Sequence, residues 1–223
     1  MNRVTAALVL LVLIAALTMQ VLWAQNQKEA VFSNPLEPKT MEAFKTTCSR
    51  LAEHPCITGN FEQEKILSRL DRSLKSSGSF IIAAGLGMAW DTVKPFPSTL
   101  VLGKDYLIQS RPGGQKTLLN AQGNETFIRL AEIISTVFSG NARGLLDNFD
   151  VYYSGSAAAW ELGLIPRDKT VGSFAETIII KGDNAIRFIQ ICEQNGDMIK
   201  YILSNHRYPP ELSIYEKALF SFP

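Results

Sequence analysis

The stretch Ser77-Gly-Ser-Phe-Ile-Ile-Ala-Ala-Gly-Leu-Gly-Met-Ala-Trp-Asp91 decides the fold class of this chain. Large apolar residues alternate along it with mostly smaller ones, and the large ones are Phe80, Ile82, Leu86, Met88 and Trp90. Because successive side chains leave opposite faces of a strand, this period of two predicts one long strand with a bulky apolar face. Gly85 and Gly87 would let the strand bend, which favours a curved or barrel-forming sheet with an apolar concave side. Periodicity alone is also compatible with an ordinary packed core beneath covering helices.

The N-terminal residues have the layout of an export signal. A short basic head precedes an uncharged run over residues 4–23, and Ala24 suits the position before a cleavage site, so residues 1–24 are predicted to be a signal peptide. Leu22 is larger than the residue usually found two places earlier, and the uncharged run is about long enough to span a bilayer, so retention as a tether is the alternative. Residues 25–39 are predicted to be a linker, and residues 40–223 to form one domain.

Composition narrows the function classes. With 46% hydrophobic residues and a net charge of +1, the chain can bury one core, and it has no basic stripe for nucleic acid and no Lys/Arg tract for an anionic membrane. In an oxidising compartment Cys48 and Cys56 could form a disulfide, with Cys192 left as a buried thiol; the alternative is that all three are small apolar fillers. The two histidines, His54 and His206, lie at no metal-ligand spacing, so no metal is expected.

The rest of the chain predicts antiparallel sheet with a few helices. Helices are expected over residues 40–53, 124–140 and 208–220, and strands over residues 57–67, 98–102, 106–111, 115–119, 151–153, 158–165, 176–181, 185–193 and 198–203. We therefore predict an α+β fold, a curved open antiparallel β-barrel or half-barrel covered by a few α-helices, in a single domain.

The helix over residues 124–140 is predicted to cover the apolar face of the sheet. Asn124 can cap its first turn and Gly140 is placed for a left-handed stop. Its apolar stripe must lie on something apolar, and the bulky face of the central strand supplies that surface. The residues expected to line an apolar cavity between the two are Phe80, Ile82, Met88, Trp90, Leu100, Leu102, Phe127, Leu130, Ile134 and Phe138.

Motifs for chemistry are absent from the sequence. It contains no Gly-x-Ser-x-Gly elbow, His-Glu-x-x-His helix, phosphate-binding loop or Gly-x-Gly-x-x-Gly turn. The carboxylates fall in expected turns or on outward-facing strand positions, where solvation explains them. This favours a binding function without a cofactor over an enzyme.

Several segments, which follow one another in the same order along the chain, resemble one family. They are Gly59-Asn-Phe-Glu-Gln-Glu-Lys65, Ser76-Ser-Gly-Ser-Phe80, Gly85-Leu-Gly-Met-Ala-Trp-Asp-Thr92 followed by Pro95-Phe96, Ala159-Trp-Glu-Leu-Gly-Leu-Ile-Pro-Arg-Asp168 and Asn195-Gly-Asp197. Together, over about residues 41–203, the chain resembles the outer-membrane lipoprotein carrier family (LolA-like). The resemblance implies a periplasmic protein, an open antiparallel barrel lidded by helices, and an apolar cavity for the acyl chains of lipoproteins. Trp90 would match the tryptophan of the family's second strand, and residues 124–140 would match a lid helix.

The resemblance also implies partners and one departure. A monomer would receive an acylated lipoprotein or a related lipid from an inner-membrane donor and deliver it to an outer-membrane acceptor. The alternatives are a non-enzymatic lipid-binding or sensing module, tethered by an uncleaved N-terminal segment, and an enzyme acting on a lipid or envelope polymer. The best-known carriers have an Arg-Pro pair six and five residues before the tryptophan, whose Arg holds the lid shut. This chain has Ala84-Gly85 there, so its lid would need another latch.

Overall fold

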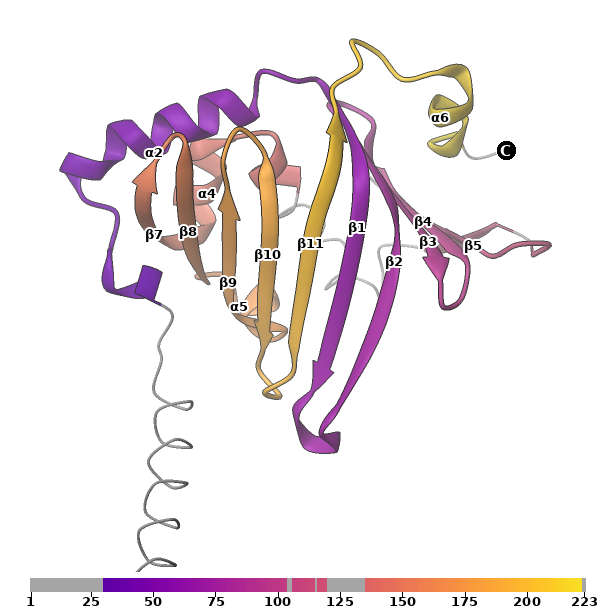
Figure 1. The fold of residues 1–223 in the computed structure, drawn as a ribbon, viewed down its shortest axis with the longest axis horizontal. Coiled ribbons are helices and arrows are strands. Elements are labelled where there is room, and N and C mark those ends of the chain that lie inside the picture. Colours follow the sequence, from indigo (N-terminus) through magenta and orange to yellow (C-terminus); the bar gives the residue numbers. More distant parts are fainter. Residues whose placement is uncertain (1–29, 104–105, 115, 120–134, 222–223) are drawn as a thin grey trace, which may run out of the picture.

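The computed structural model describes residues 30–103, 106–114, 116–119 and 135–221. Within these residues eleven strands form one antiparallel sheet in the order β6-β5-β4-β3-β2-β1-β11-β10-β9-β8-β7, so the first and last strands are neighbours in the middle (Figure 1). The strands are β1 (Cys56–Leu67), β2 (Arg72–Ala83), β3 (Gly87–Lys94), β4 (Ser98–Leu102), β5 (Leu107–Ser110), β6 (Thr117–Leu119), β7 (Phe149–Ser156), β8 (Ala159–Pro166), β9 (Ala175–Gly182), β10 (Ile186–Glu193) and β11 (Met198–Arg207). The predicted fold class, an open antiparallel sheet with a few helices, is confirmed.

The helical segments are short, apart from one. They are η1 (Ala30–Ser33), α2 (Pro38–Leu51), η2 (Ser68–Leu70), α4 (Ala142–Asn148), α5 (Lys169–Gly172) and α6 (Ile214–Leu219), and residues 135–138 are also helical. The Thr40 hydroxyl caps the start of α2 by accepting the backbone N–H of Glu37 at 3.1 Å. The closing helix is shorter than predicted, because Ser213 and Glu216 form a capping box that starts α6 after the prolines.

The central stretch is a hairpin and not the single strand that the period of two predicts. Residues 84–86 form a turn between β2 and β3; Gly85 within it has φ +78°, and Gly87, the first residue of β3, has φ +116°. A side chain at Gly87 would also place its Cβ within 2.0 Å of the Leu102 carbonyl oxygen, so this backbone needs glycine. The large apolar residues still share one face of the sheet, because Phe80 pairs with Trp90 across the hairpin and Ile82 pairs with Met88.

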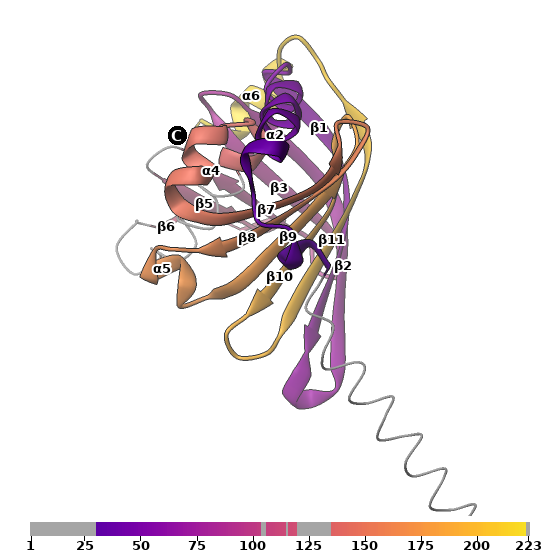
Figure 2. The same ribbon diagram turned by 90° about the vertical axis from the view of Figure 1, so that its left-hand side faces the viewer.

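The curved sheet has a different cover on each face. Its concave face packs against α2, α4 and helical residues 135–138 in the larger apolar cluster, and Figure 2 shows α2 and α4 together on one side of the strands. On the other face, a smaller cluster formed by Ala89, Val101 and Ile108 packs against Leu212 and Phe220 of the C-terminal segment. Apolar residues therefore have partners on both sides of β2–β5.

The predicted helix over residues 124–140 is described only at its end. Residues 124–134 lie outside the described residues, while residues 135–138 are helical and Gly140 adopts φ +60°. The backbone N–H of Asn141 donates to Thr136 O at 3.1 Å and that of Gly140 donates to Val137 O at 3.0 Å. These two bonds form a Schellman motif, so the predicted left-handed stop at Gly140 is confirmed.

The disulfide expected between Cys48 and Cys56 is not formed. Both cysteines are free and buried. Cys48 points from α2 into the cluster on the concave face, whereas Cys56 packs in the cluster on the opposite face. The two sulfurs therefore fill apolar space on different sides of the sheet. Cys192, predicted as a buried thiol, is half-buried.

We expect thiol titration of the denatured, unreduced protein to find three reactive thiols. In the folded protein Cys48 should stay unreactive at pH 8, because burial raises its pKa to about 11 and leaves almost no thiolate. The measurement is reaction with a chromogenic disulfide reagent before and after denaturation. A single thiol in the denatured chain would contradict the free cysteines of the structure.

Candidate functional site

A cleft of about 710 Å³ opens on the concave face, between the β2–β3 turn and helical residues 135–138. Its apolar wall is formed by Ile57, Ile82, Met88, Leu102, Phe138, Phe149 and Val171. The rest of the lining consists of His54, Pro55, Ala83, Ala84, Gly85, Leu86, Gly87, Gly103, Ser135, Thr136, Ser139, Asn148 and Asp168. The volume is in the range of small-molecule and cofactor sites.

Four of the predicted cavity residues line this cleft. Ile82, Met88, Leu102 and Phe138 all do so, and each is almost fully buried. The strand register brings three of them together, since Met88 pairs with Ile82 on one side and with Leu102 on the other. The same register places the directly paired residues of neighbouring antiparallel strands on one face of the sheet.

The other predicted residues lie farther along the concave face or outside the description. Phe80, Trp90 and Leu100 share the face of Met88, with Leu100 opposite Trp90, but they do not line the cleft. Phe127, Leu130 and Ile134 lie outside the described residues. The structure thus brings four of the ten to the cleft and places three beside it.

An aromatic cluster lies beside the cleft on the concave face. The ring centroids of Phe61 and Trp90 lie 4.5 Å apart, and Trp90 lies 5.6 Å from Phe80 and 5.5 Å from Tyr201. Phe80 is in turn 6.1 Å from Phe138, which lines the cleft. Trp90 is therefore connected to the cleft through two packed rings, and a change at the cleft can reach it by displacement of Phe138.

A partly buried ion pair interrupts the apolar surface at the far end of the same face. Lys65 Nζ donates to Glu193 Oε1 at 2.9 Å and to Oε2 at 3.2 Å, and the Glu193 side chain is almost fully buried. Burial and the neighbouring Glu193 carboxylate raise the pKa of Tyr201 to about 12, so its hydroxyl stays protonated. The sequence indicates the inward direction of Lys65 through its shared face with Phe61. Its partner lies on β10, far along the chain, and no local pattern could reveal it.

A second polar group lies beside the cleft, at the end of β11. His206 Nδ1 is 3.0 Å from Arg187 Nη1, and since guanidinium can only donate, Nδ1 must accept. Burial and the Arg187 cation lower the pKa of His206, which keeps the ring neutral. Its Nε2 is buried without a hydrogen-bond partner in the structure, and its ring lies 5.7 Å from that of Phe80. Among the described residues, no group of three His, Cys, Asp or Glu side chains could hold a metal ion.

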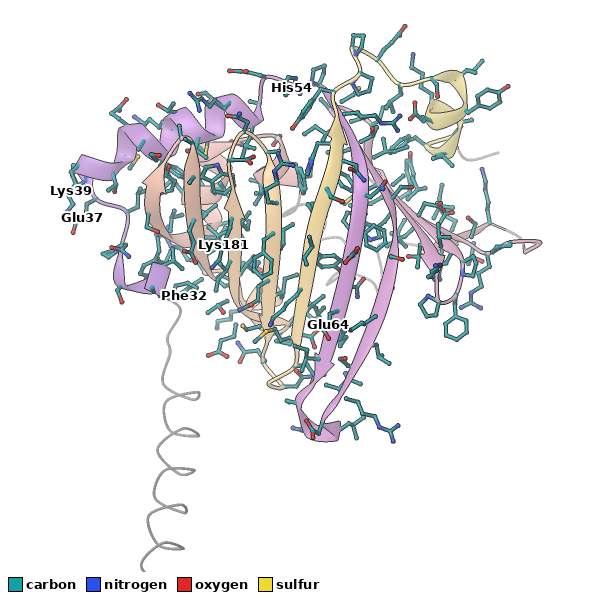
Figure 3. All side chains as sticks on the ribbon, viewed as in Figure 1. Phe32, Glu37, Lys39, His54, Glu64 and Lys181 are labelled. Carbon is teal, nitrogen blue, oxygen red and sulfur yellow. The ribbon has the colours of Figure 1, made fainter. Side chains whose placement is uncertain are left out.

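The rim of the cleft comes from segments that sequence reasoning did not assign to it. His54 lies in the link between α2 and β1 (Figure 3), Asn148 ends α4, and Asp168 precedes α5. Asp168 Oδ1 accepts the backbone N–H of Val171 at 3.1 Å, which holds that short helix at the rim. The segments that carry His54, Asn148 and Asp168 include parts far apart in the sequence, so only the folded sheet brings them together at the cleft.

The departure at Ala84-Gly85 falls at the mouth of the cleft. Both residues are exposed in the β2–β3 turn, and both line the cleft. A Cβ built on Gly85 meets no atom of the described residues within 4 Å, so they leave the mouth open at this point.

The described residues thus combine an open antiparallel sheet with a cleft that has an apolar wall and a polar rim. Residues 54–223 match the family described as "Outer membrane lipoprotein carrier protein LolA", and the chain belongs to this family. The predicted family resemblance is thereby confirmed. No match is found among curated proteins.

Solved structures with a similar fold have low sequence identity. A LolA superfamily protein from Nitrosomonas europaea is 7% identical with a TM-score of 0.44, covering 81% of this chain and 97% of that one. A putative outer membrane lipoprotein-sorting protein domain from Vibrio parahaemolyticus is 12% identical with a TM-score of 0.42, covering 81% and 99%. The MucA/MucB complex structure from Pseudomonas aeruginosa is 14% identical with a TM-score of 0.44, covering 78% and 59%. Separately, no helix among the described residues is long and apolar enough to cross a membrane.

Proposed function

We propose that this protein binds the acyl chains of lipoproteins, or of a related lipid, in the cleft on its concave face. In this proposal it carries them through the periplasm from an inner-membrane donor to an outer-membrane acceptor, without catalysing a reaction. The observation that supports it best is an apolar cleft of about 710 Å³, walled by Ile82, Met88, Leu102 and Phe138, in a member of the lipoprotein carrier family.

The chemistry of the wall suits a cargo that must be released again. Each methylene transferred from water into apolar surroundings contributes about 0.8 kcal/mol, so a few acyl chains supply substantial affinity. Contacts to aliphatic and aromatic side chains are not directional, and the flexible Met88 adapts to different chain positions. The polar rim of Ser135, Thr136 and Ser139 would face the head of the cargo.

Binding of a fluorescence-silent fatty-acyl ligand is expected to shift Trp90 emission to the blue. Trp90 is half-buried and connects to the cleft through Phe80 and Phe138, so an occupied cleft should change its surroundings. Trp160→Phe leaves Trp90 as the only tryptophan of residues 25–223, and native mass spectrometry of the purified chain would identify bound lipid independently. No change in Trp90 emission at a saturating ligand concentration, together with no bound lipid, would show that this face is an ordinary packed core.

The sensing module is distinguished by the fate of the N-terminal segment. A chain that begins near Gln25 in the soluble periplasmic fraction would support the carrier. A chain that still begins at Met1 in the inner-membrane fraction would support a tethered lipid-binding module on the same fold. Mass measurement of the purified chain separates the two.

A further inference from the structure

The tip of the β1–β2 hairpin projects beyond the strands around it. β2 begins at Arg72, but its pairing with β3 begins only at Ser77, so five residues of β2 have no β3 neighbour. On the other side, β11 begins at Met198, opposite Ile66, before the tip is reached. Figure 1 shows this hairpin extending past the ends of the neighbouring strands. All residues from 68 to 75, which we call the hairpin tip, are exposed.

The hairpin tip combines exposed leucines with positive charge. Leu70 is 64% exposed and Leu74 is 59% exposed, and neither belongs to the two apolar clusters of the core. Arg69, Arg72 and Lys75 lie among them, and Asp71 is the only acidic residue of the tip. Lys75 lies 3.7 Å from Glu64 at the surface. Neither Arg69 nor Arg72 has an ion pair with any described residue.

These features do not stabilise the folded chain. Exposed leucines contribute little to folding, and a projecting apolar tip increases the risk of aggregation. Asp71 closes the turn with φ 47°, a left-handed conformation that is uncommon outside glycine and enriched in Asp and Asn. Leu70 ends η2 directly before this turn residue.

We propose that the hairpin tip docks onto an anionic lipid bilayer. Leucines enter the boundary between headgroups and acyl chains, while neighbouring arginines and lysines contact lipid phosphates, and the two effects add. Charge complementarity thus favours an anionic bilayer over a neutral one. This inference goes beyond the proposed function, since docking does not require an occupied cleft. The sequence shows no Lys/Arg tract, and the structure places these three cations in a hairpin tip that is exposed throughout.

The β3–β4 turn supplies a second apolar contact at the same end of the sheet. Successive antiparallel hairpins turn at alternate ends, so the β1–β2 and β3–β4 turns share one end. Phe96 is 81% exposed there, between two prolines, and Lys94 is exposed beside it. A bilayer that meets the hairpin tip obliquely can receive Phe96 as well.

Docking at this end would bring the concave face close to lipid. Leu74 pairs with Lys65, which shares its face with Phe61 and hence with the aromatic cluster. Every second residue of β2 from Leu74 to Ile82 lies on this face, so one strand runs from the hairpin tip to the cleft.

Vesicle flotation of the purified chain tests the proposal. We expect binding to vesicles of phosphatidylethanolamine and phosphatidylglycerol, weaker binding at high salt, and little binding to phosphatidylcholine alone. Arg69→Glu with Arg72→Glu should lower the partition coefficient about tenfold or more, because each cation near an anionic surface contributes. Leu70→Ser with Leu74→Ser should lower it by about tenfold. All four positions are exposed, so melting temperatures should match the parent.

Matched control variants distinguish docking through the hairpin tip from an effect of net charge or exposed apolar surface elsewhere on the protein. Lys45→Glu with Arg143→Glu makes the same change in net charge on the helices, where both side chains are exposed. Ile214→Ser with Tyr215→Ser removes two exposed apolar residues from α6. Both control pairs should bind vesicles as the parent does.

A tryptophan introduced into the hairpin tip detects insertion of the tip itself, even if the N-terminal apolar segment also binds lipid. After subtraction of the parent signal, the tryptophan emission of the Leu70→Trp variant should shift to the blue with anionic vesicles and be quenched by brominated lipids. The emission of the Ile214→Trp variant should show neither change. An unquenched Leu70→Trp, or tip variants that bind as the parent does, would overturn the proposal. So would a parent that does not bind vesicles at all, because the tip would then suit a protein partner.

Discussion

Replacing Gly140 with alanine is expected to lower the free energy of unfolding by about 3 kcal/mol or more. Gly140 has φ +60°, where an L-residue loses roughly 1–2 kcal/mol. Its added Cβ would also lie only 1.9 Å from the Cys48 carbonyl oxygen in the last turns of α2, so the backbone must move. Such overpacking typically adds about 1–3 kcal/mol. Urea denaturation, followed by circular dichroism, measures the loss.

Gly113→Ala is the matched control for this change. Gly113 has a similar φ of +69°, but a Cβ there meets no atom of the described residues within 4 Å. It should therefore show only the backbone term, roughly 1–2 kcal/mol. Equal losses for the two variants would contradict the close contact between Gly140 and α2.

Replacing Met88 with aspartate is expected to weaken binding of an acyl ligand about 100-fold or more. Met88 lies in the wall of the cleft between Ile82 and Leu102. A carboxylate there is hydrated while the cleft is empty, and an entering acyl chain would remove that water without supplying a partner for the charge. A loss of about 2.7 kcal/mol of binding free energy corresponds to 100-fold. Titration of a fluorescent fatty acid measures it.

Val93→Asp places the same side chain on the same strand at an exposed position. It should leave acyl binding unchanged. Met88→Ser, which adds no charge, should weaken binding less than Met88→Asp and provides a second variant if the aspartate prevents folding. A folded Met88→Asp protein that binds the acyl ligand as tightly as the parent would exclude this cleft as the acyl site.

The sequence predicts much of the fold because the decisive signals are local. Alternation in β2 and β3 shows which side chains share a face, and Gly140 shows where a helix ends. The error at residues 84–86 has a physical reason. Because Phe80 and Ile82 pair with Trp90 and Met88, all four keep the same parity through the turn. A hairpin with this register therefore has the same alternation as one long strand, and the two glycines were the only indication of a turn.

The candidate site is less predictable because distant segments form it. Met88 and Leu102 could be expected on one wall from strand alternation, but Val171 and His54 reach the cleft from opposite halves of the chain. The buried partner of Lys65 is also distant, since Glu193 lies on β10. The candidate disulfide is absent for a related reason, because closeness in sequence does not show which side of a sheet a cysteine occupies.

The pairing of β1 with β11 has a consequence for how the protein folds. Phe61 on β1 pairs with Leu203 on β11, so the centre of the sheet joins residues that are far apart in the chain. Strands β2–β6 and β7–β10 can each form as local meanders, but neither meander is joined to the other until β11 docks beside β1. Closing so long a loop slows folding. The rate-limiting step is therefore expected to be the joining of the two preformed meanders by pairing of β1 with β11. Substitutions in these two strands should slow refolding more than substitutions in the outer strands.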